Sequence, residues 1–404
     1  MAVDFFDLPS EETFDEEPPS PIAWGLLLVT AIAAGVALTL YLWPKNRPAQ
    51  DWQFYGWMFA VPTLAWALSF AARLHSYEIC VWRVQGHNAE RIETIRHNTD
   101  YARRPLALLG YAYDTPMGRE ELAERVVGGE SVLVTRAVRN TKEVRAHSEL
   151  SRNGYPSIED LIDVAVDGLL AKIAPLLQGI PSDAPVEVWL DIRDEAADAE
   201  HGVVWQSIRR TLGAKARSLV SLGDDERVMV LDAWLDDDTP AAVKYVLIVA
   251  VQLRTEVPAD SGEAAVALLL GWPSRVDSDR GKAIALVHRP TVSPSGHDRT
   301  ALDTALDWGA ARADAVERIW VSGLTELRRD SGLVLASQAT ADEAPVTADL
   351  DAALGHTGVA CGWLAIAAAA ERCRRTGAIQ FISTEAKRQP CWLVVSPLSS
   401  HSET

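Results

Sequence analysis

The sequence predicts an α/β protein that is anchored by two transmembrane helices near its N-terminus. Two long uncharged apolar runs lie within residues 22–72, and both have the length of a membrane-spanning helix. From residue 105 onwards, apolar runs of strand length alternate with amphipathic stretches of helix length. A chain of 404 residues has room for such an anchor and for a soluble domain with a substantial core.

The two apolar runs cover residues 22–43 and 54–72, and a short polar link joins them. We therefore expect a transmembrane hairpin over residues 21–74, the alternative for the second run being a buried helix of a soluble domain. Residues 1–20 carry many acidic side chains and no base, which argues against a cleaved signal peptide and predicts an acidic disordered tail. The alternative for this tail is a short docking motif built on Phe5, Phe6 and Phe14.

The distribution of basic residues predicts the orientation of the hairpin. The link offers Lys45 and Arg47, whereas residues 73–104 are rich in arginine. By the positive-inside rule the soluble domain and both termini lie in the cytoplasm, which places the protein in a bacterial inner membrane. The polar, basic pattern of residues 75–104 predicts a juxtamembrane helix that leads into the domain.

Composition excludes several classes of function. The net charge of −18 argues against general binding to nucleic acid, because such binding needs clustered bases. Four cysteines lack the paired spacing of a zinc site and are too few for a secreted disulfide framework, so we expect reduced thiols in a cytoplasmic compartment. No glycine-rich phosphate loop is present, and we expect no cofactor.

Two further groups of residues are weak candidates for metal ligands. His288 and His297 bracket a stretch with prolines and a glycine that predicts a surface loop, and no third ligand is near them in the sequence. An acidic cluster lacks the ordered spacing of a calcium loop and is interpreted as a solvated turn. Its members are Asp232, Asp236, Asp237 and Asp238. We therefore expect no metal site.

The alternating pattern of the soluble part predicts two related α/β units, about residues 105–275 and 276–404. Helices are expected over residues 158–177, 203–219, 300–313 and 358–375. Strands are expected over residues 106–113, 186–192, 227–234, 245–253, 264–270, 283–290, 318–322, 333–337, 378–383 and 391–396.

One segment carries a resemblance to a known family. Residues 354–371 read LGHTGVACGWLAIAAAAE, and this resembles the carboxy-terminal motif of β-ketoacyl synthases and the wider thiolase-like superfamily, in which Gly-His-Thr opens a buried helix. The matching residues are Gly355, His356, Thr357, Gly358 and Gly362. Residues 261–270 and 300–313 resemble other parts of the family in the right order. The resemblance implies a thiolase-like domain of αβαβα layers over residues 105–404.

The catalytic groups of that family are largely missing. Its enzymes use a cysteine on a strand-to-helix turn in the first half, flanked by two histidines from the second half. Here no cysteine lies between Cys80 and Cys361, and residues 321–325 hold no histidine. The lysine that the family has shortly before Gly-His-Thr is also absent, and its neighbourhood holds Asp349, Asp351 and Ala352 instead. We therefore expect a pseudoenzyme with no catalytic residues, in which His356 is vestigial and satisfied at a helix start.

The expected function follows from that resemblance. Membrane-anchored domains with lapsed ketosynthase chemistry resemble adaptors encoded beside type VI secretion effectors. The expected partners are the lipid bilayer and a cytoplasmic protein, such as a secreted effector or a spike protein, and the resemblance also implies a homodimer. The alternative is a membrane-associated acyltransferase or acyl-binding enzyme that uses a serine, with His356 as its base. A third interpretation is a scaffold within a lipid-synthesis complex.

Overall fold

The computed structural model describes residues 10–44, 52–138, 141–151, 157–193, 197–223, 227–236, 245–272, 283–292, 298–325 and 346–398. The chain divides into two compact units, a smaller one over Asp4–Asn98 and a larger one that is mainly Thr99–Thr404. The predicted strand over residues 333–337 lies outside the described residues.

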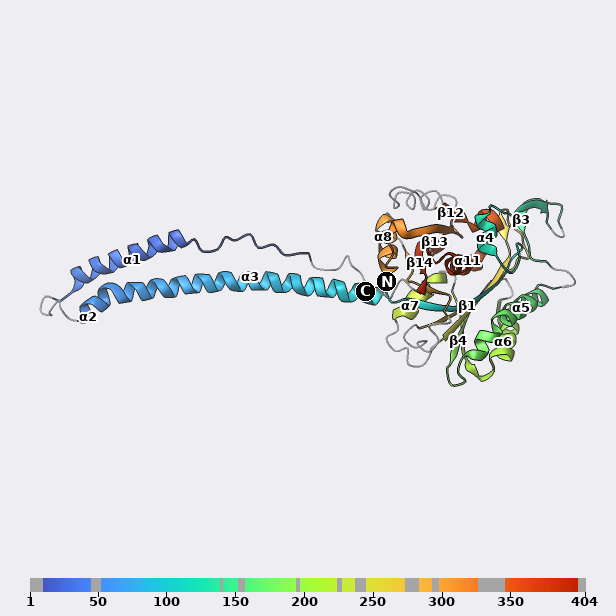
Figure 1. The fold of residues 1–404 in the computed structure, drawn as a ribbon, viewed down its shortest axis with the longest axis horizontal. Helices are drawn as coiled ribbons and strands as arrows, with labels where there is room; N and C mark the ends of the chain where they lie inside the picture. Colours follow the sequence, from blue (N-terminus) through green and yellow to red (C-terminus); the bar gives the residue numbers. More distant parts are fainter. Residues whose placement is uncertain are drawn as a thin grey trace. The chain divides into compact units, whose positions relative to one another are not determined.

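The smaller unit is built on two helical segments that run alongside each other (Figure 1). The first is α1 (Pro21–Leu42); the second begins with α2 (Trp52–Tyr55) and the π-turn η2 (Gly56–Ala60) and continues as α3 (Val61–Ala102). Close approach needs Gly35, since a Cβ atom there would lie 2.2 Å from Cγ of Pro62. The Trp66 indole also donates to the Trp24 carbonyl oxygen at 2.8 Å.

Both helical segments are long and apolar enough to cross a membrane, by length and composition alone. The predicted spans 22–43 and 54–72 fall mostly within them. No helix boundary separates the second predicted span from the predicted juxtamembrane helix, because α3 continues from Val61 to Ala102 without a break.

The larger unit contains a mixed sheet of eleven strands and a second sheet of three strands, counted over the described residues. The first half of the large sheet consists of β1 (Leu106–Asp114), β4 (Val186–Arg193), β5 (Ala216–Ser221), β6 (Tyr245–Gln252) and β8 (Ala264–Gly271). The second half consists of β9 (Ala285–Val287), β11 (Val316–Val321), β12 (Val346–Asp349), β13 (Ile379–Ala386) and β14 (Gln389–Ser396), with β10 (Thr291–Val292) beside β14.

The two halves repeat one topology. The first half has the order β1-β8-β6-β4-β5 and the second the order β9-β14-β13-β11-β12. In each half the successive pairings are antiparallel, antiparallel, parallel and parallel. The halves meet where β1 pairs antiparallel with β9. The two halves therefore share one strand order and one pattern of pairing.

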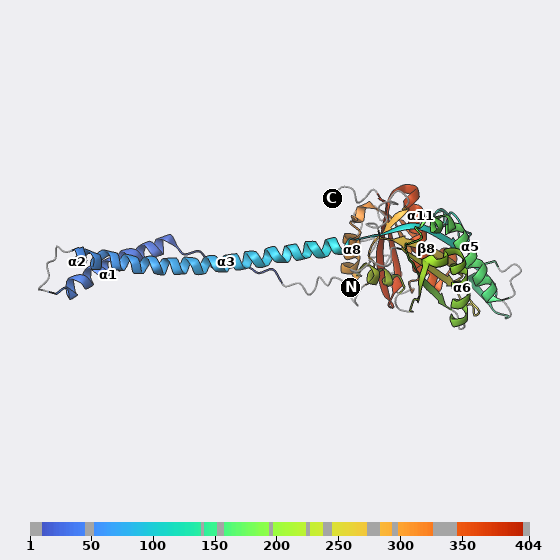
Figure 2. The same ribbon diagram turned by 90° about the horizontal axis from the view of Figure 1, so that it is seen from below.

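Helices cover both faces of the sheet and form layers with it. On β1, Leu106 and Leu108 face one hydrophobic core while Ala107 and Leu109 face another. The helices α5 (Ile158–Gly179) and α6 (Ala197–Leu212) pack together on the outer face of the first half (Figure 2). The buried helix α11 (Cys361–Thr376) contacts strands of both halves, and α8 (Asp298–Trp308) contacts β14 and β10. The larger unit is therefore a mixed α/β domain with helices on both faces of its large sheet.

Two predicted elements were wrong. Residues 227–234, expected as a strand, form the 3₁₀ turn η4 (Arg227–Met229) and helix α7 (Val230–Asp236), because the buried Val228, Leu231 and Leu235 recur at helical spacing. The predicted helix over 203–219 ends at Leu212, and β5 follows it.

The sequence did not predict β5, β10 and β12 of the large sheet or any strand of the small sheet. The small sheet has the order β2 (Val134–Ala137), β3 (Val144–Ser148) and β7 (Ser261–Gly262). β7 has only two residues, too few to show a period-two pattern.

Candidate functional site

The Gly-His-Thr turn connects two helices at the centre of the larger unit. Asp349 caps the short helix α10 (Leu350–Leu354), its Oδ1 accepting the Ala352 backbone N–H at 2.8 Å. Gly355 then takes a positive φ of 82°, and after His356 and Thr357 the 3₁₀ turn η7 (Gly358–Ala360) leads into α11. The turn thus starts the buried helix, as the sequence indicates.

Glycines allow this turn to lie against neighbouring backbone. A Cβ atom on Gly355 would lie 2.6 Å from the carbonyl carbon and oxygen of Ser261, which belongs to β7. A Cβ atom on Gly262 would lie 2.4 Å from the Leu354 carbonyl oxygen. Gly358, with φ of 55°, would similarly meet the Gln252 side chain at 1.9 Å. These close approaches explain why small residues recur in the motif.

His356 is tied to the surrounding backbone. Its N–H donates to the Asp260 carbonyl oxygen at 2.8 Å, and its own carbonyl oxygen accepts the Gly262 N–H at 3.0 Å. The Arg254 guanidinium donates to the same carbonyl oxygen at 3.0 Å. The half-buried ring accepts the Gly358 N–H at Nδ1, at 3.2 Å, which orients the imidazole within its own turn.

The segment that follows β11 is where the family resemblance predicts the first histidine. It holds Ser322 and Gly323, and both bond to the carboxylate of Asp351 on α10. The Ser322 hydroxyl donates to Oδ1 at 3.3 Å and the Gly323 N–H donates to Oδ2 at 2.7 Å. Ser322 and Asp351 are both buried, so their hydrogen bond lies in the protein interior, shielded from solvent.

In the first half, the 3₁₀ turn η4 (Arg227–Met229) leads directly into α7. Arg227, which opens η4, has a φ of 39°, a left-handed conformation that is uncommon for a residue with a side chain. The next residue, Val228, packs so closely against α11 that a Cβ on Gly362 would lie 2.6 Å from it. This turn therefore contacts the start of the Gly-His-Thr helix, and the sequence places no cysteine in it.

The cysteine beside the Gly-His-Thr turn is Cys361, the first residue of α11. Its thiol is 1% exposed and accepts a hydrogen bond from the Thr357 hydroxyl at 3.5 Å. Burial, together with the charge of Asp351, raises the pKa of the Cys361 thiol to about 12, although Thr357, Arg227 and Ser322 act in the opposite direction. A thiol with this pKa stays protonated near neutral pH, so Cys361 is not an activated nucleophile.

The acidic cluster is a correction to the sequence interpretation. Asp232 is buried, and Asp232 and Asp236 accept hydrogen bonds from Nη1 of the fully buried Arg289, at 2.6 Å and 2.5 Å. A buried guanidinium needs such counter-charges, and sequence reasoning missed the pair because its members lie more than 50 positions apart. The interpretation as a solvated turn was therefore wrong for these two residues; Asp237 and Asp238 lie outside the described residues.

The histidine pair is also placed differently from the expectation. His288 is fully buried rather than on a surface loop, and its Nε2 lies 2.8 Å from the Ser396 hydroxyl oxygen. His288 follows β9 directly, and this buried apolar strand places the histidine in the protein interior. His297 lies outside the described residues. Within the described part of the chain, no group of three His, Cys, Asp or Glu residues is arranged to hold a metal ion.

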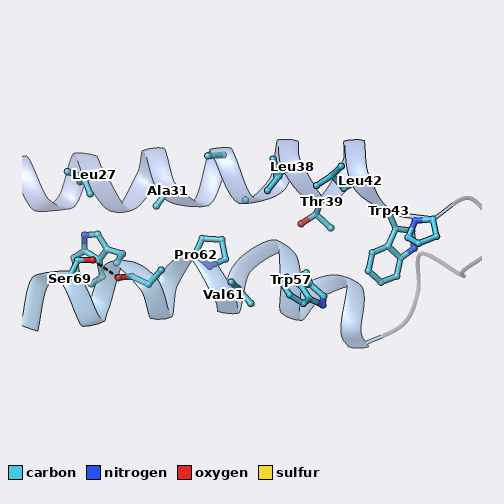
Figure 3. Close-up of a pocket in the computed structure, with 15 residues that line it drawn as sticks. Leu27, Ala31, Leu38, Thr39, Leu42, Trp43, Trp57, Val61, Pro62 and Ser69 are labelled. Atoms are coloured by element: carbon cyan, nitrogen blue, oxygen red, sulfur yellow. Dashed lines mark hydrogen bonds between the residues drawn. The ribbon is translucent and has the colours of Figure 1, made fainter.

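Two hollows lie away from the Gly-His-Thr turn. An apolar groove of 760 Å³ lies between α1 and the segment from η2 to α3, lined by residues such as Leu27, Leu38 and Val61 (Figure 3). In the larger unit, a polar pocket of 680 Å³ lies at the end of β1. Its charged residues are Asp114, Arg119, Arg136 and Glu149, which form the ion pairs Arg119–Asp114 and Arg136–Glu149.

Comparison with known proteins finds similarity in structure only. No protein-family model matches the chain, and no curated protein matches it in sequence. Among solved structures, the ketosynthase from module 1 of the bacillaene synthase of Bacillus amyloliquefaciens FZB42 matches with a TM-score of 0.55 and 12% identity, over 74% of this chain and 76% of that one.

Two further solved structures give the same result. An oxazolomycin ketosynthase domain from Streptomyces albus JA3453 matches with a TM-score of 0.52 and 13% identity, over 72% of this chain and 95% of that one. The ishigamide ketosynthase/chain length factor matches with a TM-score of 0.52 and 14% identity, over 73% and 99%. The larger unit thus has the thiolase-like fold of ketosynthase domains, as the Gly-His-Thr segment predicted.

Proposed function

We propose that this protein is a membrane-anchored pseudoenzyme whose ketosynthase-like domain binds a cytoplasmic protein partner and performs no acyl transfer. The observation that carries the proposal is the set of residues at the three catalytic positions of the fold. The strand-to-helix turn has no cysteine, Ser322 stands in place of the first histidine, and His356 remains alone. Loss of one member of a cooperative catalytic set removes most of the rate.

The contacts of the remaining groups support this proposal. Asp351 uses both carboxylate oxygens to bind Ser322 and Gly323, so the polar groups in this region bond to one another. The nearest thiol, on Cys361, is buried and protonated near neutral pH. A nucleophile needs an adjacent base and access to substrate, and these contacts favour a structural role instead.

The hairpin is the proposed anchor. Two apolar helices precede the domain, and the arginines after the second one favour a cytoplasmic domain at a bacterial inner membrane. Topology reporters fused at either terminus should give cytoplasmic signals, and a reporter inserted in the link at residue 48 should give a periplasmic signal. A periplasmic signal from the C-terminal fusion would contradict this orientation.

The partner proposed for the domain is a secreted effector or spike protein of a type VI secretion system, in line with the adaptor resemblance. Affinity purification of the intact protein from detergent-solubilised membranes should recover such a component. An unrelated tagged inner-membrane protein purified in parallel is the control. Recovery of lipid-synthesis enzymes instead would favour the scaffold interpretation over the adaptor.

A homodimer is part of the same proposal. The strand β5 is the last strand of the large sheet, and its residues alternate between exposed and half-buried. Leu219 on this strand is 36% exposed, and apolar residues at a sheet edge can pair with a second copy of the sheet. Light scattering of the detergent-solubilised protein should give a dimer mass that Leu219→Glu reduces to the monomer mass.

A further inference from the structure

An extended stretch of residues 10–17, which we call the strap, lies along α3 (Figure 1). The Asn88 side chain forms two hydrogen bonds with the backbone of Glu12, at 3.1 Å and 2.9 Å. Further along, the Phe14 ring packs edge-on against Tyr77 with ring centroids 5.4 Å apart. Glu16 pairs with Arg73 at 3.3 Å. The strap therefore runs antiparallel to α3.

The strap follows a seam with the spacing of a coiled coil. Glu78, Cys80 and His87 of α3 are half-buried, and seven further half-buried residues recur at alternating intervals of three and four, which is the a and d pattern of a heptad repeat. The members of this seam are Leu74, Tyr77, Val81, Val84, Asn88, Arg91 and Ile95. By contrast Ile79, which takes an outward heptad position, is 40% exposed. The seam is thus a continuous face of one helix.

The composition of the seam fits a parallel pair of helices. Leu74, Val81, Asn88 and Ile95 take the a positions, where β-branched residues favour two strands and one asparagine fixes the register. Tyr77, Val84 and Arg91 take the d positions. The flanking Arg73 and Glu78 take g and e positions, where opposite charges attract between two parallel copies.

The strap contacts the seam through polar interactions that are exposed to solvent and therefore weak. The Arg73–Glu16 pair is 44% and 61% exposed, and such ion pairs contribute little. The Asn88 bonds to Glu12 are also exposed. Helix α1 packs against α3 through Trp24 and Phe70, next to the start of the seam, so the strap is the segment seen to cover the seam itself. Release of the strap would expose a complete coiled-coil face.

We propose that the seam from Leu74 to Ile95 is an interface between two copies of this chain, and that the strap closes it in the single chain. In the paired state Asn88 bonds to Asn88 of the second copy, and Arg73 exchanges Glu16 for Glu78 of the second copy. The acidic strap then competes with the second copy for the same seam, and this competition sets how readily two copies pair.

Disulfide trapping in the full-length chain tests this proposal. In a Cys80→Ser background, Val84→Cys places a thiol at a central d position, whereas Ile79→Cys places a matched thiol on the outward face. Each variant is made with the native strap and with residues 10–17 replaced by a glycine-serine stretch of equal length. Cells expressing each variant are oxidised in situ, and dimers are counted on non-reducing gels.

We expect the strap replacement to raise the Val84→Cys dimer yield severalfold, while the Ile79→Cys yield stays low in both chains. Phe14→Ala, which removes the contact with Tyr77, should give an intermediate yield. Equal yields from the two cysteine positions would overturn the interface. A Val84→Cys yield that does not change when the strap is replaced would overturn its role as a competitor.

Discussion

The Ser322 hydroxyl and the Asp351 carboxylate form a buried hydrogen bond of 3.3 Å between the end of β11 and the short helix α10. The same carboxylate accepts the Gly323 N–H at 2.7 Å. These bonds join the end of β11 to α10 inside the protein. In the proposed pseudoenzyme, they take the place of the catalytic contacts that the family resemblance implies for this region.

Removal of that carboxylate should destabilise the larger unit. Asp351→Ala leaves the Ser322 hydroxyl and the Gly323 N–H buried without this partner, which costs about 2–3 kcal/mol. Asp349→Ala is the comparison variant, since it removes the carboxylate that caps α10 and should cost about 1 kcal/mol. Chemical unfolding of the full chain in detergent measures both; equal losses would contradict the structural role of Asp351.

The Gly-His-Thr turn should tolerate no side chain at its first glycine. Gly355→Ala combines a positive φ of 82° with a clash against the Ser261 backbone, so we expect a loss above about 3 kcal/mol. Gly377 also has a positive φ, but a Cβ atom there would have no neighbour within 4 Å. Gly377→Ala should therefore cost about 1 kcal/mol. The extra loss at Gly355 reports both the close approach and its glycine-only backbone conformation (φ 82°, ψ 168°), and similar values for the two variants would argue against both.

The buried thiols should be unreactive while the protein is folded. Burial raises the pKa of both Cys361 and Cys373 to about 12, so almost no thiolate is present near neutral pH. Labelling with iodoacetamide, read by mass spectrometry, should modify the half-exposed Cys80 first and the other two only on unfolding. Rapid labelling of Cys361 in the folded protein would show an accessible, activated thiol instead.

Acid should weaken the attachment of α11 to β11. Burial alone would raise the pKa of the Glu317 carboxyl, but hydrogen bonds from Arg372, Thr376 and Gln380 lower it below its ordinary value of 4.5. The unfolded carboxyl therefore binds a proton more readily than the folded one. The stability that this group contributes is present above pH 4.5 and is lost as the pH falls through the lower, folded-state pKa.

Glu317→Gln tests this dependence. We expect the variant to be less stable than the native protein by about 1–2 kcal/mol at neutral pH. The difference between the two proteins should shrink as the pH falls below 4.5, because the native carboxylate then becomes protonated. Urea unfolding over this pH range provides the measurement; a difference that grows on acidification would contradict the assigned direction.

Local patterns in the sequence were enough to predict most of the fold. Continuous apolar runs indicated the buried strands β6 and β8, and the Gly-His-Thr segment indicated both a buried helix and the thiolase-like layers. Short apolar runs were ambiguous, so α7 was predicted as a strand although Val228, Leu231 and Leu235 have helical spacing. The strand β5 was missed because it follows α6 after only a single 3₁₀ turn.

The site was harder to predict because its contacts join distant residues. No local pattern marks Arg289 as the partner of Asp232 and Asp236, so an acidic run looked like a solvated turn. Ser322 and Asp351 are likewise brought together only by the pairing of β11 with β12. The sequence alone shows that no cysteine lies between Cys80 and Cys361, whereas the contacts of Ser322 and Asp351 required the structure.

Intact-mass spectrometry of the full-length protein, after incubation with a long-chain acyl thioester, tests the absence of acyl-transfer chemistry most directly. We predict an unchanged mass and no thioester consumption, both for the native protein and for His356→Ala. Covalent acylation of the native protein that His356→Ala abolishes would contradict the account and establish an acyltransferase.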